Sequence, residues 1–164
     1  MDNQKEVFSS IYNEYQDKIL RLCFAYLDDR ENIEDIFQEV LIAIWTGLKR
    51  FRNESGYGTW VFRITVNTIF LFNKQERRNK PERIKDNIVD SSVSEMEQLI
   101  QDEYNLKRLY DTIAGLEEFD RMLMGLYLEQ LKYEEIGSIL GLSANHVGVK
   151  INRIKIKIQK QLNL

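Results

Sequence analysis

The stretch that decides the fold of this chain is YEEIGSILGLSANHVGVKINRIKIKI, residues 133–158. Residues 133–140 have the apolar spacing of a short helix, and Gly141 can supply the left-handed backbone that ends it. Ser143 is a residue type that caps the start of a helix. The helix after it has apolar residues on one face: Val147, Ile151, Ile154, Ile158 and Leu162. Two helices joined by a tight glycine turn predict a helix-turn-helix, whose second helix enters the major groove in DNA-binding proteins.

The second helix of this motif carries polar and basic residues away from its apolar face. Asn145 and His146 are suited to base edges, whereas later cations are suited to phosphates. The candidate DNA-facing set is Ser143, Asn145, His146, Val149, Lys150, Arg153 and Lys157. From residue 136 to the end there are five cations and no acid. DNA binding explains this charge, and so does a helical hairpin with a solvated basic face.

The composition predicts an all-α protein. Among 164 residues there are one proline and eight glycines, and no segment alternates apolar and polar residues for long enough to form a strand. The single cysteine excludes an intrachain disulfide, which fits a reducing compartment. Because there is no signal-peptide pattern and no apolar run of about 18 residues, we expect a cytoplasmic protein without direct membrane insertion.

The charges are segregated along the chain, although the net charge is only −3. Residues 49–85 contain ten Lys or Arg against three acids, whereas residues 86–135 contain thirteen acids against four cations. An acidic block therefore separates two basic ones. The basic blocks are where a nucleic acid would bind, although solvated surface can segregate in the same way.

Two helices are predicted before residue 49. The first, at about residues 6–27, has an apolar stripe that includes Cys23, so we interpret this cysteine as a small core residue and not as a reactive thiol. The second ends near Leu48 and carries four polar side chains together on one face: Glu34, Asp35, Gln38 and Glu39. This face is either solvated surface or a docking surface, and spacing alone favours solvated surface.

The third predicted helix follows a loop at residues 51–58, begins with Thr59 as its N-cap and ends before Pro81. Nine of the thirteen residues from 60 to 72 are Trp, Phe, Val, Ile or Leu, and the stretch after them is basic. A central core helix with a solvated tail explains this composition. A helix that also serves single-stranded nucleic acid explains it too, because bases stack on aromatic rings and cations follow phosphates.

Residues 81–98 are polar and rich in Asp and Ser, which predicts a flexible linker. The linker divides the chain into two small helical domains, residues 1–80 and residues 99–164. In the second domain, a helix near residues 99–113 ends at Gly115, and a further helix precedes the helix-turn-helix.

These segments together resemble the extracytoplasmic-function (ECF) group of sigma-70-class RNA polymerase sigma factors. The residues that carry the resemblance are EDIFQEV at 34–40, TWVFRITVN at 59–67, YEEI at 133–136, GLS at 141–143 and Val147. Each piece is moderately specific. Their order along nearly the whole chain makes the combined match strong.

The resemblance implies two domains with separate tasks. Residues 1–80 would be region 2, a helical bundle that binds core polymerase and recognises and melts the −10 element. Residues 99–164 would be region 4, whose helix-turn-helix reads the −35 element. The face with Asp35, Gln38 and Glu39 would dock on the clamp helices of the largest polymerase subunit, and the polymerase flap would be a further contact. A separate anti-sigma factor would be another partner.

The resemblance also implies a −10 site. The loop after residue 50 would hold a flipped base, and Asn67, which matches an asparagine of the family motif, would help to open the strand. The candidate set is Phe51, Asn53, Ser55, Tyr57, Trp60, Arg63, Asn67, Lys74, Arg77 and Arg78. Melting needs no covalent chemistry, because capture of unstacked bases offsets a cost of a few kcal/mol per base.

The last helix departs from the family pattern. Where the family often has Thr-Val-Lys-Ser-Arg, this chain reads HVGVKINR at 146–153, so a base preference does not carry over. One alternative is a stand-alone helix-turn-helix regulator, which leaves the aromatic helix without a task. Another is a helical adaptor that binds no nucleic acid. An enzyme, a cofactor and a metal site are not expected, because no catalytic triad, ligand cluster or phosphate-binding glycine loop occurs and there is one histidine.

Overall fold

The computed structural model describes residues 2–27, 32–52, 56–79, 108–109 and 111–162. The helices are α1 (Asp2–Tyr26), α2 (Ile33–Leu48), α3 (Tyr57–Asn79), α5 (Glu118–Leu128), α6 (Tyr133–Leu140) and α7 (Ala144–Leu162). The described residues contain no strand, which confirms the all-α prediction. The predicted linker at 81–98 and most of the helix predicted near 99–113 lie outside the described residues.

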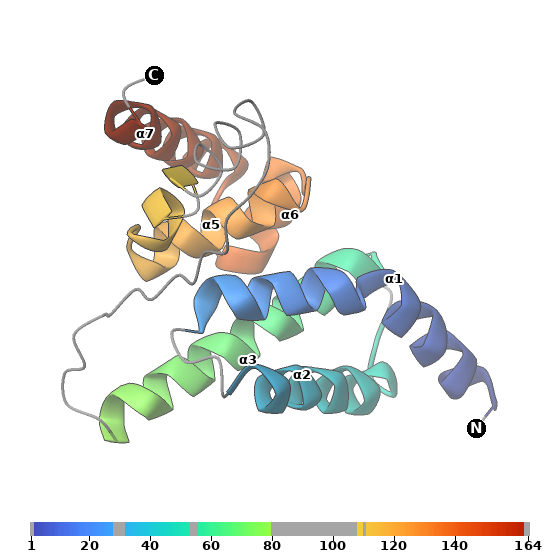
Figure 1. Cartoon of the computed structure of the whole chain (residues 1–164). Helices are drawn as coiled ribbons and strands as arrows, with labels where there is room; N and C mark the ends of the chain where they lie inside the picture. Colours follow the sequence, from blue (N-terminus) through green and yellow to red (C-terminus); the bar gives the residue numbers. More distant parts are fainter. Residues whose placement is uncertain (1, 28–31, 53–55, 80–107, 110, 163–164) are drawn as a thin grey trace, which may run out of the picture.

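The first three helices form a bundle in which each helix packs on the other two (Figure 1). The predicted stripe of α1 is buried, and the pKa of the Cys23 thiol is raised to about 12 by its burial. Cys23 is therefore a protonated core residue, as predicted. The inner face of α2 is formed by its buried residues: Ile33, Ile36, Val40 and Ile44.

Most of the apolar circumference of α3 serves the core, in agreement with the core interpretation of its composition. The fully buried residues are Val61, Phe62, Val66 and Ile69, while Leu71 is 67% exposed. Phe62 also meets the edge of the Tyr15 ring from α1, with ring centroids 6.0 Å apart. A helix with core neighbours on several sides needs apolar residues around most of its circumference.

The prediction that Thr59 caps α3 is wrong. The helix begins at Tyr57, and the Trp60 N–H donates to the Gly56 carbonyl at 3.2 Å. Because helical hydrogen bonding already starts in the glycine loop, Thr59 lies inside the helix and is buried. Its hydroxyl donates to Glu135 Oε1 of α6 at 3.4 Å.

The helix-turn-helix forms as predicted. α6 ends at Leu140, and Gly141 adopts the left-handed conformation with φ 72°. The His146 N–H donates to Ser143 Oγ at 3.3 Å, so Ser143 caps the start of α7. The inner face of α7 is fully packed: Val147, Ile151, Ile154 and Ile158.

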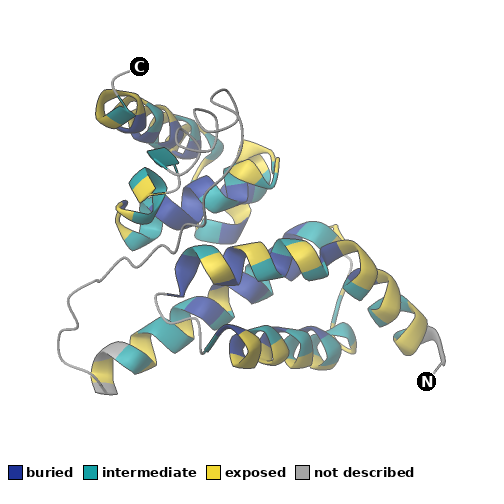
Figure 2. Cartoon of the chain, in the orientation of Figure 1, coloured by how far each residue is buried: buried dark blue, intermediate teal, exposed yellow. Residues whose placement is uncertain are grey.

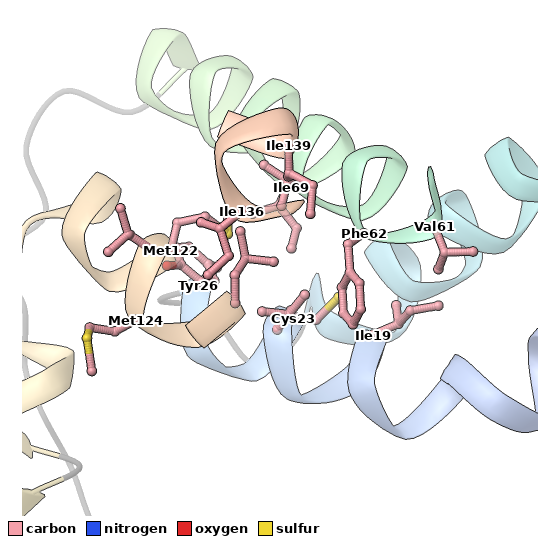
Figure 3. Packing of buried hydrophobic residues seen from close by; sticks show 14 of the residues in the cluster. Ile19, Cys23, Tyr26, Val61, Phe62, Ile69, Met122, Met124, Ile136 and Ile139 are labelled. Carbon is pink, nitrogen blue, oxygen red and sulfur yellow. The ribbon is translucent and has the colours of Figure 1, made fainter. Parts of the chain in front are cut away.

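The two groups of helices pack against each other. α5 lies on α1 and α6 lies on α3, while α7 packs on α5 and α6 at the far side from α1–α3 (Figure 1). The buried faces therefore run through both groups (Figure 2). Figure 3 shows Ile136 and Ile139 of α6 beside Ile69 of α3, with Tyr26 and Met122 close by. One continuous core joins the two ends of the chain.

Candidate nucleic-acid interface

The candidate −35 residues lie on one side of α7 and at its cap. Six of the seven are exposed: Ser143, Asn145, His146, Val149, Arg153 and Lys157. Positions 145, 149, 153 and 157 are four residues apart, so they form one row along the helix, which we call the α7 row. The α7 row faces away from the buried residues that fix the helix. A duplex can therefore reach this row without any movement of the helix-turn-helix.

Two lysines of α7 turn toward α5 instead of lying in the α7 row. Lys150 Nζ lies 3.8 Å from Asp120 Oδ1 and 5.1 Å from the Phe119 ring centroid. Lys155 Nζ donates to the Tyr127 hydroxyl at 2.7 Å, and this hydrogen bond raises the pKa of Lys155. The structure therefore does not place the Lys150 ammonium beside Arg153 and Lys157, and the phosphate contact of Lys150 stays a prediction. Tyr127 is too distant in sequence for spacing to have revealed its bond to Lys155.

Three candidate −10 residues form an aromatic cluster at the start of α3. Phe51 stacks on Tyr57 with ring centroids 4.6 Å apart, and it lies tilted against Trp60 at 4.8 Å. Gly47 makes room for the cluster, because an added Cβ would be 2.9 Å from Trp60 Cζ2. An open hollow of about 440 Å³ adjoins it, lined by Ala43, Trp45, Thr46, Gly47, Lys49 and Arg50. Asn53 and Ser55 lie outside the described residues.

The remaining −10 candidates are spread along α3. Arg63 Nη2 donates to the Ser138 carbonyl at 3.2 Å and to Ser138 Oγ at 2.5 Å, so it points to α6. Asn67 is exposed one turn further on, and Lys74 and Arg78 are exposed near the end of the helix. A rise of about 1.5 Å per residue puts Lys74 about 20 Å from Trp60 along the axis. The aromatic and basic groups thus lie at opposite ends of one helix; the side chain of Arg77 is not described.

The four polar residues of α2 are all exposed and share one face, which we call the α2 face: Glu34, Asp35, Gln38 and Glu39. Sequence reasoning missed a fifth member. Ile42 lies one turn after Gln38 and is 62% exposed. Its spacing of four residues from Gln38 could have placed Ile42 on this face from the sequence alone. A large apolar side chain beside acids gives this face the mixed character of protein-binding surfaces.

The described residues offer no sign of a metal centre or of a membrane anchor. Within them, no group of three or more His, Cys, Asp or Glu side chains is placed to hold a metal ion. None of the described helices is both long enough and apolar enough to cross a membrane.

Comparisons with known proteins agree with this arrangement. The Sigma-70 region 2 family matches residues 11–79. The ECF RNA polymerase sigma-E factor of Haemophilus influenzae is 29% identical over 171 residues, covering 96% of this chain and 88% of the relative. The ECF RNA polymerase sigma-E factor of Escherichia coli K12 is 28% identical over 168 residues, covering 96% and 87%.

A solved structure shares the whole architecture. The sigma factor RpoE of Bartonella quintana, crystallised with the anti-sigma factor NepR, superposes with a TM-score of 0.78 at 16% sequence identity. The match covers 97% of this chain and 98% of that chain, which establishes the common fold. The region 2 match, the relatives that span nearly its full length and this common fold make the chain similar to sigma-70-class RNA polymerase sigma factors of the ECF group.

Proposed function

We propose that this chain binds core RNA polymerase, directs it to specific promoters and assists promoter melting for transcription initiation. The observation that carries the proposal is that one chain combines the exposed α7 row with the exposed α2 face and the aromatic cluster of α3. A stand-alone regulator would need only the α7 row. The names of the relatives, which are sigma factors of RNA polymerase, support the same function.

The tasks divide along the chain. Residues 1–80 act as region 2, residues 81–98 as the linker, and residues 99–164 as region 4. The α2 face, with Ile42 at its edge, docks on the clamp helices of the largest polymerase subunit, and region 4 contacts the flap. The exposed acids on α2 and the apolar Ile42 support this contact, because a charged rim around an apolar anchor is typical of protein interfaces.

Region 2 opens the −10 element by binding, without covalent chemistry. An unstacked base enters beside the aromatic cluster, where Lys49 and Arg50 at the adjoining hollow attract the phosphates. Asn67 holds the separated strand, and Lys74, Arg77 and Arg78 follow the backbone. The protein is therefore a binding subunit and not an enzyme, and it works in the cytoplasm with the polymerase. An anti-sigma factor is a further partner, in line with the complex of the Bartonella protein.

Transcription in vitro with core polymerase and a promoter library tests this function. A variant with Asp35→Arg reverses an acid of the α2 face, and Glu14→Arg reverses an exposed acid of α1 as its control. We expect Asp35→Arg to lose polymerase binding and transcription, while Glu14→Arg keeps both. If the unchanged protein binds no core polymerase in a pull-down, it is not a sigma factor.

Replacing Lys157 with alanine is expected to weaken duplex binding by about threefold to tenfold at low salt, and equally for all sequences. The reason is that Lys157 is exposed at the end of the α7 row, where a cation meets phosphate. Lys155→Ala is the matched control, because Lys155 is bonded to Tyr127. Fluorescence anisotropy against salt measures both. A change of sequence preference in Lys157→Ala would show that our placement of the helix in the groove is wrong.

Replacing Asn145 or His146 is expected to change which −35 sequence is preferred. Both side chains are exposed at the first turn of α7, the part of a recognition helix that reaches base edges. The expected loss on the original sequence is about 1–3 kcal/mol of binding free energy. Selection of bound duplexes from a random pool measures the preference. An unchanged preference at reduced affinity would assign these two residues to the backbone instead.

A further inference from the structure

We propose that Val149 recognises a thymine of the −35 element through the C5-methyl group of that base. This inference rests on the proposed function of the α7 row and deepens it, because it names a base that the row selects. Asn145 and His146, the residues given to base edges above, act through hydrogen bonds. Val149 adds a contact of another kind, between two apolar groups.

Val149 is an apolar residue on the side of α7 that is otherwise polar. It is 43% exposed, while the buried residues of α7 lie on the opposite side. Figure 2 shows exposed residues along the side of α7 that is turned away from α5 and α6. Valine is also a poorer helix former than alanine or lysine, so neither burial nor helix propensity accounts for it here. Because single apolar residues are common on protein surfaces, its task must be argued from its neighbours.

The neighbours of Val149 are the residues that we assign to DNA. The helical repeat places Asn145 and Arg153 about 40° to either side of Val149, each one turn away, and His146 about 60° from it. Val149 therefore lies at the centre of the exposed side of α7. The chain carries no acid after Glu135, so no like charge on α7 repels a duplex from this side. A major groove that receives Asn145 and His146 brings base edges to Val149 as well.

The chemistry of the major groove decides which base suits a valine. Thymine presents its C5-methyl group there, whereas adenine and guanine present hydrogen-bonding groups and cytosine lacks the methyl. An apolar side chain over a hydrogen-bonding group removes water from it and offers no replacement. Val149 thus favours thymine by apolar contact and disfavours purines by desolvation. Burial of one methyl group contributes about fourfold to affinity.

Helix geometry places this thymine relative to the base that Asn145 contacts. The four residues from Asn145 to Val149 span about 6 Å of helix axis, and successive base pairs are about 3.4 Å apart. The thymine should therefore lie within about two base pairs of the base that Asn145 contacts. Asparagine is suited to adenine N6 and N7, so we expect an adenine and a thymine at this spacing in the selected sequence.

Ile156 provides a matched control on the same side of α7. It is 45% exposed, nearly the same as Val149, and it lies about 10 Å further along the helix. The major groove is about 12 Å wide, and the first turns of a recognition helix reach its base edges. Ile156 therefore matches Val149 in exposure and chemistry but lies beyond the bases. A general effect of exposed apolar residues would appear at both positions, whereas thymine recognition appears only at Val149.

Replacement of thymine by uracil isolates the proposed contact, because uracil pairs with adenine in the same way and lacks only the methyl group. Duplexes bound by the whole chain are selected from a random pool, and each thymine of the selected sequence is then replaced by uracil, one at a time. Fluorescence anisotropy measures the affinity for each duplex. We expect one thymine whose replacement weakens binding by about fourfold.

Variants of the chain assign this fourfold difference to a residue. Val149→Ser should bind the thymine and uracil duplexes within about 1.5-fold of each other, because the apolar contact is gone. Val149→Ile keeps a branched apolar side chain and should keep the difference, and so should Ile156→Ser. All three changes are at exposed positions, so circular dichroism should show the same helix content.

A second measurement looks for a gain of affinity. Cytosine is placed at the position of the sensitive thymine and compared with 5-methylcytosine, which carries its methyl group at the same place. We expect the unchanged chain to bind the methylated duplex about fourfold more tightly, and Val149→Ser to bind both duplexes equally.

Three outcomes overturn the inference. The first is a selected duplex in which no thymine is sensitive to uracil replacement. The second is a fourfold difference that persists in Val149→Ser or disappears in Ile156→Ser. The third is a selection that recovers no preferred sequence, because the α7 row then contacts no base edge. Failure of the proposed function looks different: the chain then binds no core polymerase in a pull-down, whichever bases it prefers.

Discussion

Replacing Asn67 with alanine is expected to slow open-complex formation by about tenfold to a hundredfold. Asn67 is exposed on α3, one turn beyond Arg63, where its amide can bond to a strand leaving the duplex. Loss of a hydrogen bond that forms only with the melted strand removes about 1.5–3 kcal/mol from the open state. Permanganate footprinting of unpaired thymines over time measures the rate.

Polymerase binding by the Asn67 variant is expected to stay within about twofold of the unchanged protein, because the α2 face is untouched. Gln75→Ala is the control, since it removes an amide of similar size from another exposed position of the same helix. This control should melt promoters normally. An equal loss of polymerase binding and of melting in Asn67→Ala would contradict the role given to Asn67.

Replacing Gly137 with valine is expected to lower the free energy of unfolding by about 3 kcal/mol or more. Gly137 is buried in α6, and a Cβ there would collide with the backbone carbonyl of Leu142 in the turn of the helix-turn-helix. Because the obstacle is backbone, it cannot move aside as a side chain would. Chemical denaturation followed by circular dichroism measures the loss, and duplex binding should fall with it.

Gly115→Val is the matched control for Gly137→Val. The nearest neighbours of its added Cβ are the carbonyls of Asp111 and Thr112 at 3.5 and 3.6 Å, which is ordinary contact. We expect this control to change the free energy of unfolding by less than about 1 kcal/mol. A stable Gly137→Val protein that still binds duplex would show that the turn after α6 can shift without loss of its fold.

The helix-turn-helix could be predicted from sequence because its determinants are local. Gly141 ends α6, Ser143 caps α7, and a repeat of three and four positions defines the buried face of α7. Each of these features involves residues within a few positions of one another. The bounds of α6 and the burial of Cys23 followed in the same way from periodicity.

The packing of the two groups of helices could not be predicted, because its determinants are distant in sequence. Arg21 and Glu129 form an ion pair between the groups, yet they are ordinary surface residue types 108 positions apart, and nothing in either local sequence indicates the other. Thr59 shows how the same limit produces an error. A threonine before a helical run fits the pattern of an N-cap, and only the folded loop reveals that Gly56 accepts the first hydrogen bond.

Local sequence likewise predicts some features of the candidate sites, whereas others depend on residues distant in the chain. Spacing along α7 sufficed to gather most of the α7 row, but the turn of Lys150 toward Asp120 depends on α5. The aromatic cluster joins residues on either side of a loop, and only the family resemblance brought Phe51, Tyr57 and Trp60 into one group before the structure did. Their task in melting stays a prediction.

On α7 the buried residues that hold the helix in place are separate from the exposed α7 row, and this separation affects how such proteins diversify. The buried residues of α7 fix the helix in the fold: Val147, Ile151, Ile154 and Ile158. The exposed positions between them contribute little to stability. Exposed substitutions usually change stability by less than about 0.5 kcal/mol. With the α7 row reading the −35 element as we propose, a duplicated gene can acquire a new set of target promoters by single substitutions in that row, and each intermediate still folds. Regulatory circuits built from copies of one such chain can become insulated from one another without any redesign of the scaffold.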